Sequence, residues 1–163
     1  GMNASFWPLF GHIKRRDIPM TSPVLMDYRG LGGGDLTPAG EVKSWSMAFL
    51  YRTAAQGATG TDSADERVKI VDVPEAQVLA VGLQGTYSMK RVRQGVEMLA
   101  QWMNAHPEWK PAGEVRAFFY QGPDTPARLL WSEVHLPIAP SGAAPLATPA
   151  PAAPQATPPS EPK

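Results

Sequence analysis

The stretch from Phe6 to Met26 constrains the fold more than any other part of the chain, because it must change from helix to strand within a few residues. It opens with an apolar stripe at helical spacing, formed by Phe6, Leu9, Phe10 and Ile13. Pro19 and Pro23 then each remove a backbone N–H and favour extended geometry in the residue before them. Because prolines in strands occur at edges, starts or bulges, the sequence predicts a helix over residues 5–16 and a strand over residues 19–29.

The remainder of the first 138 residues reads as two related halves. In the second half Gln77–Gly85 predicts a strand, Ser88 caps a helix that Pro107 closes, and Val115–Tyr120 and Leu129–Ile138 predict two further strands. The first half shows the same order without the opening strand: a helix, the strand over residues 19–29 and a strand over residues 44–52. The Gly- and Ala-rich segments 30–41 and 54–66 are expected to be loops without regular structure.

Several short motifs follow one another in a characteristic order along the chain. The run Ile18–Val24 (IPMTSPV) directly follows the predicted short helix. The later segments are Val78 to Gly85, Gly113–Tyr120 with Arg116, Pro123–Arg128, and the pair Glu133 and Val134. Over residues 5–138 this set of motifs resembles the SOUL family, also called the heme-binding protein family. The resemblance implies a member, taken as bacterial, that is related to the GyrI-like ligand-binding domains.

The expected fold class is α+β. It is a duplicated β-α-β-β unit that forms a twisted, barrel-like antiparallel sheet flanked by two helices, with the first strand missing. The missing strand leaves one edge of the sheet unpaired, and two copies of the chain could form a homo-oligomer through that edge. Residues 1–138 are predicted to form this ligand-binding domain. Residues 139–163, almost entirely Pro, Ala, Thr and Ser, are predicted to form a disordered tail.

Composition excludes several classes of function. The formal net charge is zero and there is no long run of basic residues, so the sequence lacks the positive charge typical of nucleic-acid-binding proteins. The absence of cysteine excludes disulfides and thiolate chemistry, and no apolar run reaches membrane-spanning length. Localisation stays open: cytoplasmic for the sequence as given, periplasmic or secreted if an N-terminal signal has been removed before Gly1.

The three histidines do not form a metal-ligand pattern. His12 lies beside the apolar helical stripe, His106 precedes Pro107 at a helix end, and His135 lies on the last strand. A surface or helix-capping role is favoured over ligation for each, and no metal site is expected. No serine has the context of a catalytic nucleophile, so no catalytic residue is assigned.

Glu133 is the most informative ionisable residue. Alternation on the last strand places it with Trp131 and His135 on one face and Val134 on the other. In GyrI-type domains, a last-strand Glu faces a hydrophobic cavity, which would suit a cationic or hydrogen-bonding ligand. The alternative, a surface glutamate in a salt bridge, is weighed equally. The predicted ligand-binding residues are Met20, Met47, Tyr120, Trp131, Glu133 and His135.

Two functions from different classes follow from this resemblance. The first is a non-enzymatic binding module for non-covalent heme, another tetrapyrrole or a similar flat hydrophobic molecule, held mainly by apolar contacts. The second is a small hydrolase that acts on a hydrophobic substrate in the same cavity, with Glu133 as acid/base and Tyr87 or Tyr120 beside it. A partner protein at the tail or sheet edge is a third alternative.

Overall fold

The computed structural model describes residues 2–32, 36, 38–122 and 124–142; the side chains of residues 2–4 are not described. Its helices are α1 (Met2–Arg15) and α2 (Met89–Ala105), and the short 3-10 helices are η1 (Ala54–Gln56) and η2 (Ala127–Leu129). Its strands are β1 (Val24–Arg29), β2 (Ser44–Phe49), β3 (Gly60–Thr61), β4 (Lys69–Ile70), β5 (Gln77–Gln84), β6 (Trp109–Pro111), β7 (Val115–Phe119) and β8 (Trp131–Pro140). The predicted tail lies almost wholly outside the described residues.

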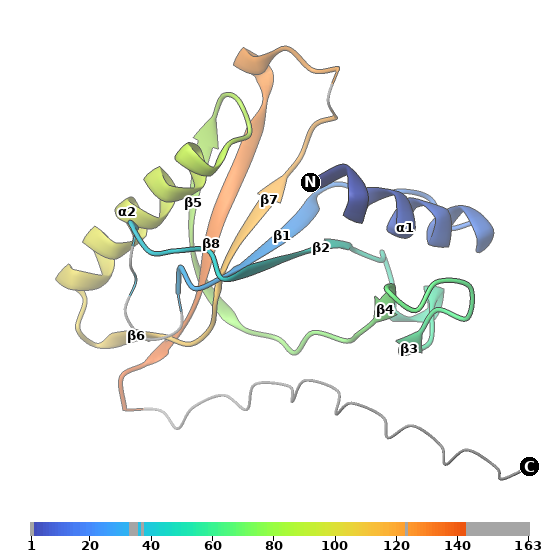
Figure 1. Ribbon diagram of the computed structural model, residues 1–163. Coiled ribbons are helices and arrows are strands. Elements are labelled where there is room, and N and C mark those ends of the chain that lie inside the picture. The colour runs from blue at the N-terminus through green and yellow to red at the C-terminus, as the bar shows by residue number, and fades with distance from the viewer. Residues whose placement is uncertain (1, 33–35, 37, 123, 143–163) are drawn as a thin grey trace, which may run out of the picture.

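One antiparallel sheet organises the structure (Figure 1). Its strands follow the order β2-β1-β7-β8-β5, and β6 pairs with the far end of β8. The α+β class with two helices and an antiparallel sheet is confirmed. The sheet stays open from β2 to β5 and does not close into a barrel, which differs from the barrel-like form expected.

The two halves meet at the centre of the sheet, where β1 pairs with β7. On one side β2 pairs with β1, and on the other β8 pairs with β7. The first strand of the second half, β5, pairs with the outer edge of β8. Within the described residues no strand occupies the corresponding outer edge of β2, in agreement with the missing opening strand.

The first helix ends at Arg15, shortly before the prolines at positions 19 and 23. Lys14 and Arg15 lie in its last turn, where cations interact favourably with the helix dipole. Asp17 follows with a φ of 51°, and the Ile18 N–H donates to the Ile13 carbonyl at 2.9 Å. Residues 18–23 form no helix or strand, and β1 begins only at Val24, after Pro23. The predicted strand over residues 19–29 therefore started too early.

The second helix covers one face of the sheet. As predicted, Ser88 is its N-cap and accepts a hydrogen bond from the Arg91 N–H at 3.3 Å. Val92, Val96 and Leu99 are buried on the side of α2 that packs against β5 and β8. The strands contribute most of the rest of this core through Met26, Tyr28, Leu83, Val115, Ala117, Val134, Leu136 and Ile138. Burying such side chains supplies the main stabilisation of the domain.

The segment between β2 and β5 is more ordered than its composition suggested. It contains η1 and a two-stranded sheet in which Gly60 pairs with Ile70 and Thr61 with Lys69. The expectation that residues 54–66 lack regular structure was wrong. Strand β6, in which Trp109 pairs with Pro140, was not predicted from the sequence either.

Candidate functional site

The face of the sheet opposite α2 carries the residues singled out on β8. Val134, Leu136 and Ile138 point to the core with at most 7% exposure. Trp131, Glu133 and His135 alternate with them and therefore share the opposite face. The alternation predicted from the sequence is confirmed, and Glu133 is a half-buried residue on this second face.

The strand register defines what surrounds Glu133. Cross-strand partners in an antiparallel sheet lie on the same face, so two transverse rows can be followed across the five strands. One row contains Gly82, Glu133, Phe118, Leu25 and Ala48. The neighbouring row contains Ala80, His135, Arg116, Asp27 and Ser46. The first row is apolar except for one carboxylate, and the second is mostly polar. We call the surface formed by these rows with Trp131 and Tyr120 the Glu133 face.

Glu133 lies at the centre of a small hydrogen-bonded cluster. The Tyr120 hydroxyl donates to its Oε2 at 2.7 Å, and the His135 Nε2 lies 2.9 Å from the same oxygen. These bonds, that of Tyr120 first, lower the pKa of Glu133. Burial and the neighbouring carboxylate raise the pKa of Tyr120 to about 12. At neutral pH the cluster therefore presents a carboxylate held by two side chains.

Aromatic and small residues flank this cluster. The ring of His135 lies 4.3 Å from that of Phe118, centre to centre. Trp131 is 47% exposed, and the glycine at position 82 leaves the edge of its ring 3.9 Å from where a Cβ would stand. Ala80 and Gly82 are themselves exposed on β5. The exposed surface around Trp131 and β5 on the Glu133 face therefore consists of aromatic and small side chains.

The polar row has incompletely paired groups. Arg116 Nε lies 3.6 Å from Asp27 Oδ2, and both side chains are about three-quarters buried. Neither Arg116 Nε nor Asp27 Oδ1 has a hydrogen-bond partner within the described part of the chain. Burial raises the pKa of Asp27 despite the nearby Arg116. Arg116 and Asp27 thus make fewer hydrogen bonds than buried polar groups usually do.

Four of the six residues predicted to bind a ligand come together on this face, namely Tyr120, Trp131, Glu133 and His135. Met47 does not join them, because it pairs with Met26 and packs against the core on the opposite face. Met20 lies in the irregular segment before β1 and lines a separate pocket. Tyr87, considered beside Glu133 in the hydrolase alternative, bonds instead to Gln121 and to the Trp131 carbonyl.

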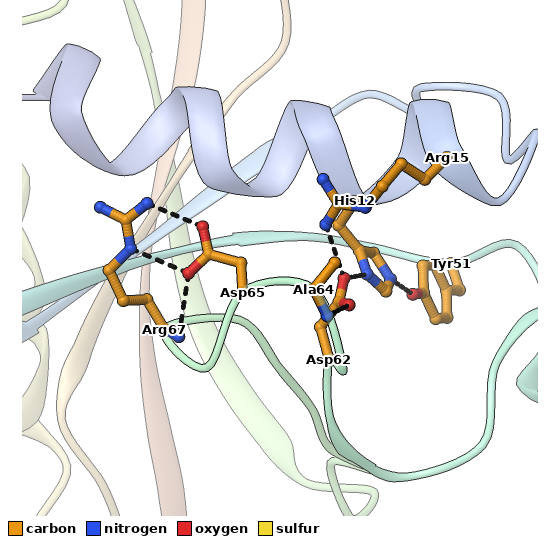
Figure 2. A network of polar contacts seen from close by, with 7 residues as sticks. All are labelled: His12, Arg15, Tyr51, Asp62, Ala64, Asp65 and Arg67. Atoms are coloured by element: carbon orange, nitrogen blue, oxygen red, sulfur yellow. Dashed lines mark hydrogen bonds and ion pairs between the residues drawn. The ribbon is translucent and has the colours of Figure 1, made fainter.

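A second polar cluster was not foreseen from the sequence (Figure 2). His12 of α1 is only 2% exposed; its Nδ1 contacts Asp62 Oδ2, and its Nε2 lies 2.6 Å from the Tyr51 hydroxyl. The expectation that His12 is a surface or capping histidine was wrong. Its partners are distant in sequence: Tyr51, 39 residues away, lies at the end of the strand predicted over residues 44–52, and Asp62, 50 residues away, lies in a segment predicted to be loop, so no local pattern could reveal them.

Asp62 is fixed on several sides. The Ala64 N–H donates to Oδ1 at 2.8 Å, and Arg15 Nη2 donates to Oδ2 at 2.9 Å. The Ala64 hydrogen bond, followed by that of His12, holds the pKa of Asp62 well below its usual range. Asp62 is therefore an ionised, nearly buried carboxylate behind His12.

Tyr51 connects this cluster to an open pocket of about 260 Å³. The pocket is lined by Met20, Thr21, Ser22, Leu50, Tyr51 and Arg52. The hydroxyls of Thr21 and Ser22 donate to the backbone carbonyls of Leu50 and Tyr120, which fixes its wall. Its volume is below the usual range for sites that enclose a small molecule, so a larger ligand would lie against its opening.

His106 behaves as its position before Pro107 suggested. It is the C-cap residue of α2, and its ring stacks on Trp102 with centres 3.9 Å apart. Among the described residues, no three of the His, Asp and Glu side chains are grouped to hold a metal ion. Nor does either helix of this part of the chain have the length and apolar character needed to cross a membrane.

Comparison with known proteins gives one clear match. A family model described as SOUL heme-binding protein matches residues 1–137, which is most of the chain. Neither the curated proteins nor the solved structures contain a match.

Proposed function

The chain belongs to the SOUL heme-binding protein family, and from this premise we propose that it binds heme, another tetrapyrrole or a similar flat hydrophobic molecule on the Glu133 face. Binding is non-covalent and rests mainly on apolar contact. The ligand-binding residues proposed are Tyr120, Trp131, Glu133 and His135. The observation that carries the proposal is the exposed Trp131 on the same sheet face as Phe118 and the small residues of β5, a face that α2 does not cover.

The energetics favour a large planar ligand. Apolar surface removed from water contributes about 25 cal/mol per Å², so a macrocycle that covers a few hundred Å² gains several kcal/mol before the cost of association. The His135 Nε2 is already engaged by Glu133 at 2.9 Å. Ligation of an iron by that nitrogen would break this contact, which supports apolar contact over histidine ligation on this face.

Glu133 adds selectivity to this surface. Its carboxylate would attract a cationic or hydrogen-bond-donating edge of the ligand and would repel an acidic edge. The acidic groups of a heme would therefore point away from Glu133. The cation of this face is Arg116 on β7, which lies across from His135 of β8. Its side chain is 28% exposed.

The hydrolase alternative is less well supported by the same cluster. A general acid at neutral pH needs a raised carboxyl pKa, whereas the hydrogen bonds from Tyr120 and His135 lower the pKa of Glu133. The cluster is thus suited to hold a charge in place. A base role for Glu133 in hydrolysis would require a substrate that displaces Tyr120 from it.

Absorbance titration tests the proposal, using ferric heme, metal-free protoporphyrin and a set of apolar molecules that are not tetrapyrroles. Trp131→Ala is expected to weaken porphyrin binding by about tenfold or more, equal to about 1.4 kcal/mol. The matched control is Trp7→Ala, which removes an exposed tryptophan from α1. Equal affinities for wild type and Trp131→Ala would contradict the proposed site.

Two further variants separate apolar contact from specific polar contacts. His106→Ala combined with His135→Ala should leave heme affinity within about tenfold, or 1.4 kcal/mol. Glu133→Gln should weaken cationic apolar ligands by about 1–3 kcal/mol, the scale of a hydrogen bond to a charged group. A loss of several hundredfold on His135→Ala alone would show histidine ligation instead.

A further inference from the structure

One side of α1 carries apolar side chains that the sheet does not cover. Trp7 is 64% exposed, more than any other tryptophan of the described residues. Its ring meets that of Phe10 edge-on, with the ring centres 6.0 Å apart. Phe6, by contrast, packs on Phe49 of β2. The helix therefore turns Phe6 toward the sheet and leaves Trp7 in contact with solvent.

The irregular segment after α1 extends this apolar surface. Phe10, Ile18 and Met20 line the same open hollow of about 170 Å³. Met20 is 43% exposed and also belongs to the wall of the 260 Å³ pocket that contains Tyr51. Phe10 thus connects two exposed apolar side chains, Trp7 and Met20. We call Trp7, Phe10, Ile18 and Met20 the Trp7 patch.

Cations border the Trp7 patch. Lys14 lines the hollow, and its Nζ lies 5.5 Å from the centre of the Phe10 ring. Arg52 lines the neighbouring pocket. Arg16 lies close enough to Tyr51 of that pocket to oppose the rise in its pKa that burial causes. Three basic side chains therefore lie along the edge of the patch.

These charges are only weakly balanced within the chain. Among the described residues, the side chains of Arg16 and Arg52 make no hydrogen bond or ion pair, and the ammonium of Lys14 has the Phe10 ring as its partner. Of the described residues that line the hollow or the pocket, only Asp17 is acidic. The formal net charge of the chain is zero, so this region is positive through the local arrangement of its residues. Exposed rings beside such cations suit a partner that is both apolar and anionic.

We propose that the Trp7 patch binds the surface of a membrane that contains anionic lipids. Trp7 and Met20 enter the boundary between headgroups and acyl chains, and the three cations bind lipid phosphates. Tryptophan suits this boundary because its ring is apolar and its N–H is polar. A helix with aromatic residues and cations on its exposed side lies in the plane of such a surface. The inference concerns a surface apart from the Glu133 face and does not depend on ligand binding there.

The arrangement of the cations favours a lipid surface over a second copy of the chain. Lys14 and Arg52 line different hollows, and Arg16 lies beside the second one. A bilayer offers phosphates at many positions, so it can meet all three cations while it covers the apolar side chains. In a two-fold dimer the same patch would face itself, which would bring like charges together.

Sedimentation with lipid vesicles tests the inference on the full chain. Vesicles of phosphatidylcholine alone are compared with vesicles that also contain phosphatidylglycerol. Wild type should bind the anionic vesicles about tenfold or more tightly, and salt should weaken that binding because it screens exposed charges. Trp7→Ala should weaken binding to the anionic vesicles by about tenfold or more.

Two matched pairs of variants separate the patch from the rest of the surface. Met20→Ala should weaken binding to the anionic vesicles by about threefold or more, because less apolar surface is buried. Met98→Ala removes a methionine of similar exposure from α2, at the other end of the sheet, and should stay within about twofold (Figure 1). Lys14→Glu should weaken binding by about tenfold or more, whereas Lys90→Glu, at an exposed lysine of α2, should stay within about twofold.

Each variant should keep the far-ultraviolet circular dichroism of wild type, so that a loss of binding reports on the patch. If wild type does not bind anionic vesicles, or if Trp7→Ala and Lys14→Glu bind them as wild type does, the inference is overturned. If Trp7→Ala instead lowers the mass of a self-associated chain in light scattering, a second copy covers the patch and the inference is likewise overturned. The proposed heme binding stands or falls by its own titration in each case.

Discussion

Gly95 of α2 lies so close to Val134 of β8 that a Cβ at position 95 would come within 2.6 Å of the Val134 Cγ2. Val134 is 1% exposed and stands between the helix and the sheet. The helix can rest on β8 at this distance only because position 95 has no side chain. This contact sets how closely α2 approaches the sheet, and it makes the core tight beneath the Glu133 face.

Gly95→Ala should therefore destabilise the domain although alanine is the better helix former. Overpacking of this kind costs about 1–3 kcal/mol, which outweighs the roughly 1 kcal/mol gained in helix propensity. The control is Gly11→Ala in α1, where a Cβ would meet only the flexible end of Arg15 at 3.1 Å. Urea unfolding of both variants checks this, and an equal free energy of unfolding would contradict it.

The raised pKa of Tyr120 should respond to the charge of Glu133. Burial is the first cause of the value of about 12, and the Glu133 carboxylate adds to it. Glu133→Gln should lower the pKa of Tyr120 while burial keeps it above its ordinary value of 10.0. Tyr28, whose pKa of about 12 comes from burial alone, is the internal control. Alkaline titration followed by NMR of the tyrosine rings measures both residues.

Asp62 should contribute stability that is lost in acid. Its folded-state pKa is lowered from 3.8, so its contribution is fully present above the unfolded pKa and disappears as pH falls through the folded value. Asp62→Asn should be less stable than wild type at pH 7, and the difference should shrink below about pH 4. Thermal unfolding across pH measures this. Asp65→Asn removes the exposed ion pair with Arg67 and should cost less.

The outer edge of β2 is expected to mediate self-association. Unpaired N–H and C=O groups on an end strand tend to pair with another chain. Light scattering at several concentrations should show a mass that rises with concentration. Ser46→Lys, which adds a charge to this end strand, should reduce the association. A mass that stays monomeric at all concentrations would show that the edge is closed in another way.

Local patterns were sufficient for one part of the site. Trp131, Glu133 and His135 share a face because side chains alternate along any strand, and that rule needs no knowledge of the neighbouring strands. The same rule placed Val134 in the core. Ser88 and Pro107 bounded α2 correctly because capping and proline effects act within a few residues.

What the sequence could not supply depends on pairing between distant segments. Met47 was grouped with Glu133, but the register that pairs it with Met26 puts it on the core face. His12 contacts Tyr51, 39 residues later, and Asp62, 50 residues later, and the Gly- and Ala-rich composition around Asp62 indicates only a loop. Whether the sheet closes is likewise decided by its two end strands, β2 and β5, and not by any one of its strands.

The two helices are attached to the sheet unequally, and this has a consequence for local unfolding. The main contact of α1 with the sheet is through the end strand β2, whereas α2 packs on both β5 and β8. The bridge from His12 to Asp62 ties α1 to the loop around β3 (Figure 2). These segments should open together as one cooperative unit while the central strands stay closed, so their amide hydrogens would exchange first and at similar rates.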